Sequence, residues 1–224
     1  RAILDIRSAN KMGCKVIRQQ YLLSPNGLAR IAPYAEAYGV KVGIEIHNPE
    51  TPNSPAMMAY REAIDKSGSK YIGFVPDFGC FATKPNKPHW DEALKNGADL
   101  RLLEMARDMR YDAVPMEEAQ KRLKENGATT LELALLQEMY AFLQFKKDCK
   151  KELEGLKEIM PHCFHMHGKF HYLYEDLTEA SIPYEEILNV VKESDYNGYE
   201  DHESGNALLM TARHQQMMRK ILEK

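Results

Sequence analysis

The sequence has 224 residues, which is long enough for one domain with a substantial hydrophobic core. Its 44% hydrophobic and 28% charged residues are typical of a globular protein. The net charge of −3 gives no electrostatic basis for binding nucleic acid or an anionic membrane, and no apolar run reaches the roughly 20 residues of a membrane span. We therefore expect neither a nucleic-acid partner nor a membrane.

The cysteines indicate the compartment. The four of them, at positions 14, 80, 149 and 163, have neither CxxC spacing nor the density of a disulfide scaffold. We therefore expect reduced thiols and a cytoplasmic location. Residues 1–13 carry charges throughout, so they predict an amphipathic helix instead of a signal peptide.

Strands and helices are predicted to alternate from residue 15 onward. In chain order we expect a strand at 15–20, a helix at 26–38, a strand at 41–47, a helix at 54–67 and a strand at 71–79. After a long helical stretch come a strand at 162–170, a helix at 181–194, a strand at 198–203 and a helix at 206–223. This alternation predicts parallel βαβ units.

The stretch 89–159 is rich in Ala, Leu, Lys and Glu and predicts three helices, broken near Val114–Pro115 and at Asn126–Gly127. No chemistry can be assigned to it. We expect an α/β fold, a (β/α)8 TIM barrel that lacks its first strands, with 1–224 as one domain of the C-terminal five βα units. Residues 89–159 would be a helical insertion in that domain.

Ionisable side chains stand near the ends of four predicted strands: Glu45, Asp77, His167 and Glu203. In a parallel barrel all the carboxyl ends of the strands meet at one mouth, where active sites lie. Alternation along the strands directs Glu45 and His47, and likewise His165, His167 and Lys169, toward the interior.

Three carboxylates in one mouth would repel each other without a cation. Oxygen and nitrogen ligands without thiolate suit Mn²⁺, Mg²⁺ or Co²⁺ better than a structural zinc ion. Taken alone, Glu203 is more often a solvated residue at a strand end, and Asp77 before Phe78–Gly79 is more often a turn residue. The four positions together favour a metal site.

Four segments resemble the xylose isomerase-like barrels, also called sugar phosphate isomerases and epimerases: GVKVGIEIH, YIGFVPDFG, FHMHGKF and YNGYEDHES. The resemblance implies that Glu45, Asp77, His167 and Glu203 hold a divalent metal. The last strand departs from the family pattern, because Glu200 and His202 would face the helical layer. This leaves Glu200 as the alternative fourth ligand.

Within this superfamily, the Glu45–His47 pair, VPDFG and HMHGKF are most similar to the catalytic alpha subunit of bacterial C-glycoside deglycosidases. That resemblance implies a manganese-dependent lyase acting on 3-oxo-C-glucosides, with a smaller partner subunit in a larger oligomer. Cys80 stands where the ketose 3-epimerases of the superfamily place a substrate-binding histidine, which argues against a standard epimerase. Cys80 and His165 are the residues that we expect to bind substrate.

For catalysis we expect His47 to remove the C2 proton and Lys169 to neutralise developing charge. His47 could instead only orient Glu45, and His165 could only orient His167. Two alternatives remain for the whole chain. It could be an aldose–ketose isomerase or epimerase that uses the same metal site, or a non-catalytic sugar-binding or assembly subunit. An endonuclease is disfavoured by the acidic charge.

Overall fold

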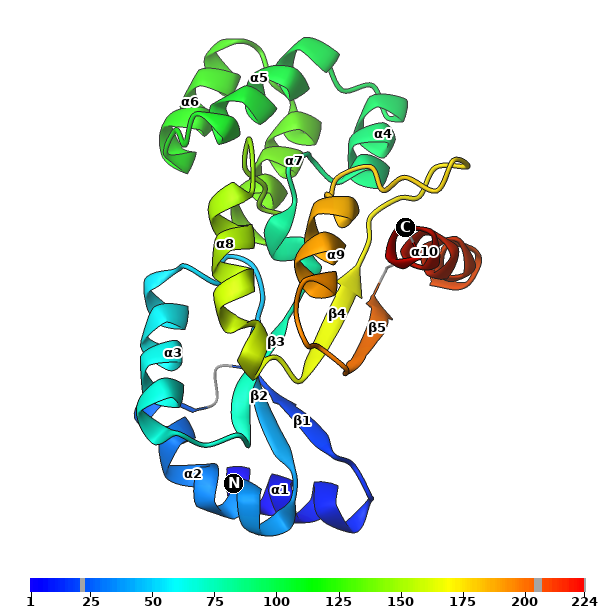
Figure 1. Cartoon of the computed structure of the whole chain (residues 1–224). Helices are drawn as coiled ribbons and strands as arrows, with labels where there is room; N and C mark the ends of the chain where they lie inside the picture. The colour runs from blue at the N-terminus through cyan, green and yellow to red at the C-terminus, as the bar shows by residue number, and fades with distance from the viewer. Residues whose placement is uncertain (21–22, 204–206, 224) are drawn as a thin grey trace.

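The computed structural model describes residues 1–20, 23–203 and 207–223, without the side chains of residues 199, 202, 203 and 207–209. Five strands are present in these ranges: β1 (Val16–Gln19), β2 (Lys41–Ile46), β3 (Ile72–Pro76), β4 (His165–Lys169) and β5 (Tyr199–Glu203). Parallel pairing joins β1 to β2, β2 to β3, and β4 to β5. Two parallel bridges, Phe74 with Cys163 and Asp77 with His167, connect β3 to β4. The spatial order of the strands therefore follows the chain (Figure 1).

Helices connect these strands in the pattern of βα units. The described helices are α1 (Ala2–Lys11), α2 (Pro25–Tyr38), α3 (Pro55–Ser67), α4 (Lys87–Lys95), α5 (Leu100–Tyr111), α6 (Met116–Glu125), α7 (Thr130–Ala141), α8 (Lys150–Ile159), α9 (Tyr184–Lys192) and α10 (Ala207–Leu222), with 3₁₀ turns η1 (Phe78–Phe81) and η2 (Met160–His162). No described helix combines the length and the apolar character that crossing a bilayer requires.

The ends of α2 show how the sequence sets these boundaries. The Ser24 hydroxyl accepts a hydrogen bond from the Gly27 amide at 3.1 Å, and Pro25 occupies the first helical position. Gly39 ends the helix with a φ of +61°, a backbone conformation that residues other than glycine rarely adopt. Only Gly39 and Val40 separate the end of α2 from the start of β2.

The strand β2 separates an apolar face from an ionisable one, as predicted. Val42, Ile44 and Ile46 are all fully buried in the core, and α2 and α3 pack against this three-stranded sheet. Gly43 pairs with Gly73 on β3, and a Cβ atom at Gly73 would lie 2.0 Å from the His162 carbonyl oxygen. Only glycine therefore permits this close approach of β3 to the start of β4.

The insertion contains five helices, α4 to α8, so the prediction of three helices over 89–159 is wrong. The predicted breaks at Val114–Pro115 and Asn126–Gly127 are present, but further breaks occur at Gly97, with φ of +97°, and between α7 and α8. The side chain of Glu132, at the start of α7, accepts hydrogen bonds from the Thr129 and Asp99 amides, both at 2.7 Å. One buried carboxylate thus fixes the first turns of α5 and α7 together.

On β5, Glu200 lies on the opposite face of the sheet from His167. A Cβ atom at Gly168 would meet the Glu200 carboxylate at 2.3 Å and the His214 ring of α10 at 3.0 Å, so Glu200 packs over Gly168 under that helix. Its buried Oε1 atom accepts no hydrogen bond from the described residues. Burial, and then the charge of Asp201, raises the pKa of Glu200 to about 8. The alternative that Glu200 is the fourth metal ligand therefore has no support in this geometry.

We predict that Glu200→Gln removes a pH-dependent loss of stability. In the wild type, the unfolded carboxyl loses its proton near pH 4.5 while the folded one keeps it to about pH 8, so stability falls across this interval. The variant should be more stable than the wild type by about 1–3 kcal/mol at pH 8.5 and nearly equal to it at pH 4.5. Urea unfolding at both pH values measures this; an equal difference at both would contradict it.

Candidate metal centre

Three strand ends bring Glu45, Asp77 and His167 together. Glu45 pairs across the sheet with Val75, two residues before Asp77, and Asp77 itself bridges to His167 on β4. Each of the three residues is buried, and each can offer one ligand atom such that all three atoms lie within 4.8 Å of one another. The His167 Nδ1 atom is 2.9 Å from Glu45 Oε1. These are three of the four residues that the strand-end pattern predicted to lie together.

The fourth predicted ligand is Glu203. Its backbone pairs with Lys169 at the end of β5, but its side chain lies outside the part of the chain that the structure describes. Its role as fourth ligand therefore stays a prediction.

Two basic side chains accompany the buried acids. Arg18 Nη1 on β1 is 2.6 Å from Glu45 Oε1, and Lys169 Nζ on β4 is 3.1 Å from Asp77 Oδ2. A bound cation is therefore not needed as the sole source of compensating charge, because Arg18 and Lys169 supply positive charge themselves. Arg18 was missed from the sequence, although its backbone pairs with Gly43, two residues from Glu45.

The donor atoms still fit a divalent cation. The Glu45 Oε2 atom is buried and accepts no hydrogen bond from any described residue, which leaves an anionic oxygen unsatisfied inside the protein. Two carboxylates and one imidazole, without thiolate, match the ligand preferences of Mn²⁺, Mg²⁺ or Co²⁺. Glu45, Asp77 and His167 are thus a possible divalent-cation site by position, burial and chemistry.

The protonation states of Glu45 and His167 depend on each other. Burial is the largest effect on Glu45 and acts to raise its pKa, but the hydrogen bonds of His167 and Arg18 outweigh it, and the pKa is lowered. Burial acts to lower the pKa of His167, but Glu45, Asp201 and Asp77 together raise it. Without metal, the pair therefore favours carboxylate and imidazolium, and a cation would replace the His167 proton.

His47 and Lys169 adjoin the triad on its Asp77 side. Lys169 Nζ is 3.3 Å from His47 Nε2, and His47 Nε2 is 3.9 Å from Asp77 Oδ2. Asp77 is held in turn by the Gly79 amide, which donates to Oδ1 at 2.6 Å. The two residues predicted to be catalytic therefore lie together beside one carboxylate of the triad.

The two residues predicted to bind substrate have different surroundings. The buried Cys80 thiol donates to the Asp77 carbonyl oxygen at 2.9 Å, and burial, then the charge of Asp77, raises its pKa well above the usual value. His165 is partly exposed, and its Nε2 atom is 3.3 Å from Asp201 Oδ2. Cys80 braces the turn after β3, while His165 lies at the start of β4, on the same face as His167; substrate binding by either stays a prediction.

Asp201 is a second residue that the sequence reasoning missed. Its Oδ2 atom lies 3.7 Å from His167 Nε2, in addition to its contact with His165. His165, His167 and Asp201 form a further group with ligand atoms within 4.8 Å of one another. Alternation on β5 places positions 201 and 203 on one face, so the assignment of Glu203 already implied an inward Asp201.

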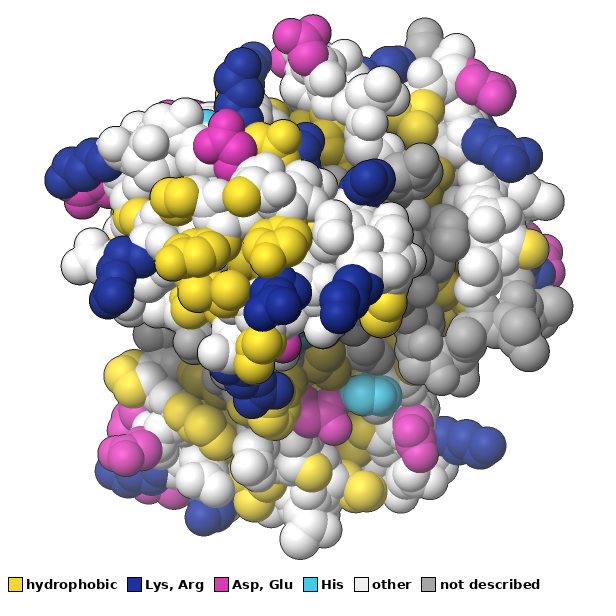
Figure 2. All heavy atoms as spheres, turned by 90° about the horizontal axis from the view of Figure 1, so that it is seen from below, with side chains coloured by type: hydrophobic (Ala, Val, Ile, Leu, Met, Phe, Trp, Pro, Cys, Tyr) yellow, Lys and Arg dark blue, Asp and Glu magenta, His cyan; other side chains and the backbone are white. Residues whose placement is uncertain are grey.

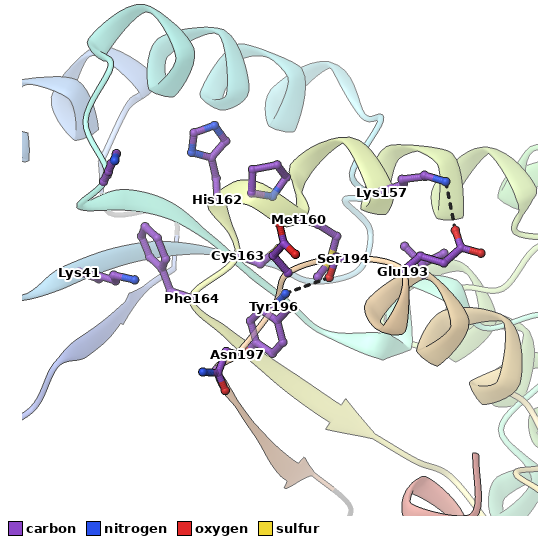
Figure 3. Close-up of a pocket in the computed structure, with 15 residues that line it drawn as sticks. Lys41, Lys157, Met160, His162, Cys163, Phe164, Glu193, Ser194, Tyr196 and Asn197 are labelled. Atoms are coloured by element: carbon purple, nitrogen blue, oxygen red, sulfur yellow. Dashed lines mark hydrogen bonds and ion pairs between the residues drawn. The ribbon is translucent and has the colours of Figure 1, made fainter. Parts of the chain in front are cut away.

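A hollow of about 790 Å³ lies at the opposite, amino-terminal ends of the strands (Figure 3). It is lined by residues such as Lys41, Cys163, Phe164 and Tyr196. Lys157 there pairs with Glu193 at 3.1 Å, and burial raises the pKa of the Cys163 thiol far above its usual range. This end of a barrel generally serves stability, so we assign no chemistry to the hollow.

One face of the molecule carries charges of both signs. On the face shown in Figure 2, basic and acidic side chains are interspersed, with hydrophobic side chains exposed between them. No single charge sign dominates this face, which agrees with the net charge of −3.

No family model matches the chain. Among curated proteins, it is 27% identical over 204 residues to a 3'-dehydrocarminate deglycosidase alpha subunit of a Microbacterium species, covering 87% of this chain and 58% of that protein. It is 28% identical over 201 residues to a C-glycoside deglycosidase alpha subunit of Arthrobacter globiformis, covering 87% of this chain and 55% of that protein. The resemblance stated from the motifs is confirmed. The chain spans less than three fifths of the length of these relatives.

Solved structures confirm the fold. The chain matches a D-tagatose 3-epimerase-like protein with a TM-score of 0.52 at 16% identity, covering 99% of this chain and 67% of that one. It matches an L-ribulose 3-epimerase with a TM-score of 0.50 at 14% identity, covering 99% and 65%. A zinc-bound IOLI protein matches with a TM-score of 0.50 at 12% identity, covering 99% and 67%. The five strands and their helices thus have a TIM-barrel-like α/β fold.

We predict that Arg18→Met destabilises the metal-free protein by about 1–3 kcal/mol at pH 7, because Glu45 loses its guanidinium partner. The lowered pKa of folded Glu45 means that its contribution is complete above pH 4.5 and lost as pH falls through the folded value. The difference should therefore shrink at pH 3.5. Urea unfolding in EDTA measures it.

Arg61→Met is the matched control, because Arg61 pairs with Glu158, whose side chain is 53% exposed. Its effect should stay below about 1 kcal/mol. Equal effects of the two substitutions would contradict the stabilising role of Arg18.

Proposed function

We propose that the chain carries the metal-binding and catalytic site of a lyase that cleaves the C-glycosidic bond of 3-oxo-C-glucosides. The similarity to C-glycoside deglycosidase alpha subunits supports this class of substrate. The observation that carries the proposal is the placement of His47 and Lys169 beside Asp77 of the triad. Because the relatives are alpha subunits, we also propose a smaller partner subunit in a hetero-oligomer, in the cytoplasm.

Glu45, Asp77 and His167 would hold the cation, with Glu203 as a fourth ligand and Mn²⁺ as the proposed metal. Bound there, the cation supplies Lewis-acid polarisation of the C3 carbonyl of a 3-oxo sugar. That carbonyl acidifies the neighbouring C2–H bond, so a weak base is sufficient to remove the proton near neutral pH.

His47 is the proposed base. Its Nδ1 atom lies 2.9 Å from the Asn48 carbonyl oxygen, and because a carbonyl can only accept, Nδ1 carries the hydrogen. The lone pair is then on Nε2, which faces Lys169 and Asp77. This tautomer leaves Nε2 able to take a proton from substrate.

The proposed reaction breaks the C2–H bond and the C1–aryl bond of the sugar. The C2 proton moves to His47 Nε2, the C2 electron pair forms a C1–C2 double bond, and the C1–aryl bond breaks. The aryl carbon leaves with the bonding pair and takes up one proton, which gives the free aromatic aglycone and an unsaturated 3-oxo sugar. Lys169 would hydrogen-bond the oxygen on which negative charge develops.

The alternative is a sugar isomerase or epimerase that uses the same site, in which Glu45 or Glu203 moves the proton. The 3-epimerases among the solved structures favour it through the fold alone. Against Glu45 as base stands its 2.6 Å ion pair with Arg18 and the lowered pKa of its carboxyl. A base so stabilised as an anion is a poor proton acceptor.

The test uses the intact protein, stripped with EDTA and assayed with a 3-oxo-C-glucoside before and after Mn²⁺ is restored. We expect aglycone release, measured by liquid chromatography, to fall to the uncatalysed background without metal and to recover with it. Sugar rearrangement without aglycone release would support the isomerase. Metal binding without turnover of either kind would support a non-catalytic sugar-binding or assembly subunit, and unchanged activity in EDTA would overturn the metal site.

We predict that His47→Ala lowers turnover by at least about 100-fold while bound Mn²⁺ stays near the wild-type level, because His47 acts on substrate and not on the cation. Turnover and metal content, measured by mass spectrometry, check this. The control is His162→Ala, which replaces a histidine at the amino-terminal ends of the strands. Loss of metal in His47→Ala would instead assign His47 to orienting the ligands.

A further inference from the structure

The His167 ring lies between two carboxylates. Its Nδ1 atom is 2.9 Å from Glu45 Oε1, and its Nε2 atom is 3.7 Å from Asp201 Oδ2. The β4–β5 register sets His167 directly opposite Asp201, so this neighbour is fixed by the strand pairing and not by a loop. Glu45 belongs to the triad, while Asp201 lies on the other side of the ring.

The two ring nitrogens of a neutral imidazole have opposite roles: one carries a hydrogen and the other a lone pair. A cation shared with Glu45 needs the lone pair on Nδ1, the nitrogen that faces Glu45. Nε2 must then carry the hydrogen. Histidines that bind metals usually donate this second N–H to a carboxylate, which fixes the tautomer and the ring orientation.

Asp201 is placed to be this acceptor, and His165 holds it in position. The Asp201 Oδ2 atom is also 3.3 Å from His165 Nε2, and the His165 and His167 rings meet edge to face at 5.8 Å between centroids. One carboxylate oxygen thus lies between two imidazoles on neighbouring positions of the same strand face. This arrangement gives His165 a role in supporting the site without contact with the cation.

A second cation held by His165, His167 and Asp201 is the competing reading of the same group. It would require His167 to give a lone pair from Nε2 while Nδ1 does the same toward Glu45. A neutral imidazole has only one such lone pair, so both cations together would demand loss of its last ring hydrogen. Asp201 is also 51% exposed, in contrast with the buried triad.

We propose that Asp201 is a positioning residue: it accepts a hydrogen bond from His167 Nε2–H and so keeps the Nδ1 lone pair directed at the cation shared with Glu45 and Asp77. The proposal rests on the metal site of the proposed function. Its test therefore includes one measurement on the metal-free protein and one on metal binding.

The first measurement is the ring N–H proton signal of His167 Nε2 in the metal-free protein, read by ¹H–¹⁵N NMR at a pH where the ring is an imidazolium and both nitrogens carry a hydrogen. We expect a downfield Nε2–H signal that exchanges slowly with water in the wild type, and its upfield shift or loss by exchange in Asp201→Ala. Asp201→Asn keeps an acceptor oxygen and should restore much of this signal. Asp195→Ala, which removes an exposed aspartate from the loop before β5, should leave the signal unchanged.

The second measurement is Mn²⁺ binding by titration calorimetry. We expect one equivalent in every variant, with an affinity about 10- to 100-fold weaker in Asp201→Ala, closer to wild type in Asp201→Asn and unchanged in Asp195→Ala. Wild-type affinity and an unchanged His167 Nε2–H signal in Asp201→Ala would overturn the proposal. Two equivalents in the wild type and one in Asp201→Ala would overturn it in favour of a second cation.

The two proposals can fail separately. If the wild type binds no divalent metal but Asp201→Ala still changes the His167 Nε2–H signal, the proposed metal chemistry fails and the orienting role of Asp201 stands. If metal binds and this signal is independent of Asp201, the metal site stands and the positioning role fails. Dispersed amide spectra of each variant confirm that the fold is retained.

Discussion

The site depends on how parallel strands distribute charge. Side chains alternate between the two faces of a strand, so a strand that buries Val42, Ile44 and Ile46 must direct Glu45 to the other face. When neighbouring strands follow the same rule, acids from each of them meet at one end of the sheet. Such a cluster is stable only with nearby positive charge, and Arg18, His167 and Lys169 supply it here.

Much of this arrangement could be predicted because it follows from local patterns. The five strands, the outward apolar face of β2 and the meeting of Glu45, Asp77 and His167 all come from alternation and strand order, which one sequence contains. Arg18 and Asp201 were not predicted from the sequence. An arginine in VIRQ or an aspartate in YEDHE is locally unremarkable, and only the cross-strand register reveals which residue it pairs with.

The helical insertion was harder to predict from its sequence. Its breaks at Val114–Pro115 and Asn126–Gly127 contain the usual helix-ending residues, whereas residues 142–149 hold neither proline nor glycine. The chain leaves α7 there because Lys146 donates its amide to the Ala82 carbonyl oxygen and Phe145 packs against Tyr111. These are tertiary contacts between segments more than thirty residues apart, which helix propensity does not record.

The pairing of the buried acids with basic side chains of the same chain has a consequence for cation binding. A site built only from carboxylates would be forced open, or would not assemble, before its ion arrived. Here the Arg18 side chain, 47% exposed, compensates the charge of the deeply buried Glu45 before any cation binds. A cation at the proposed site would therefore meet acids whose repulsion the chain itself already offsets.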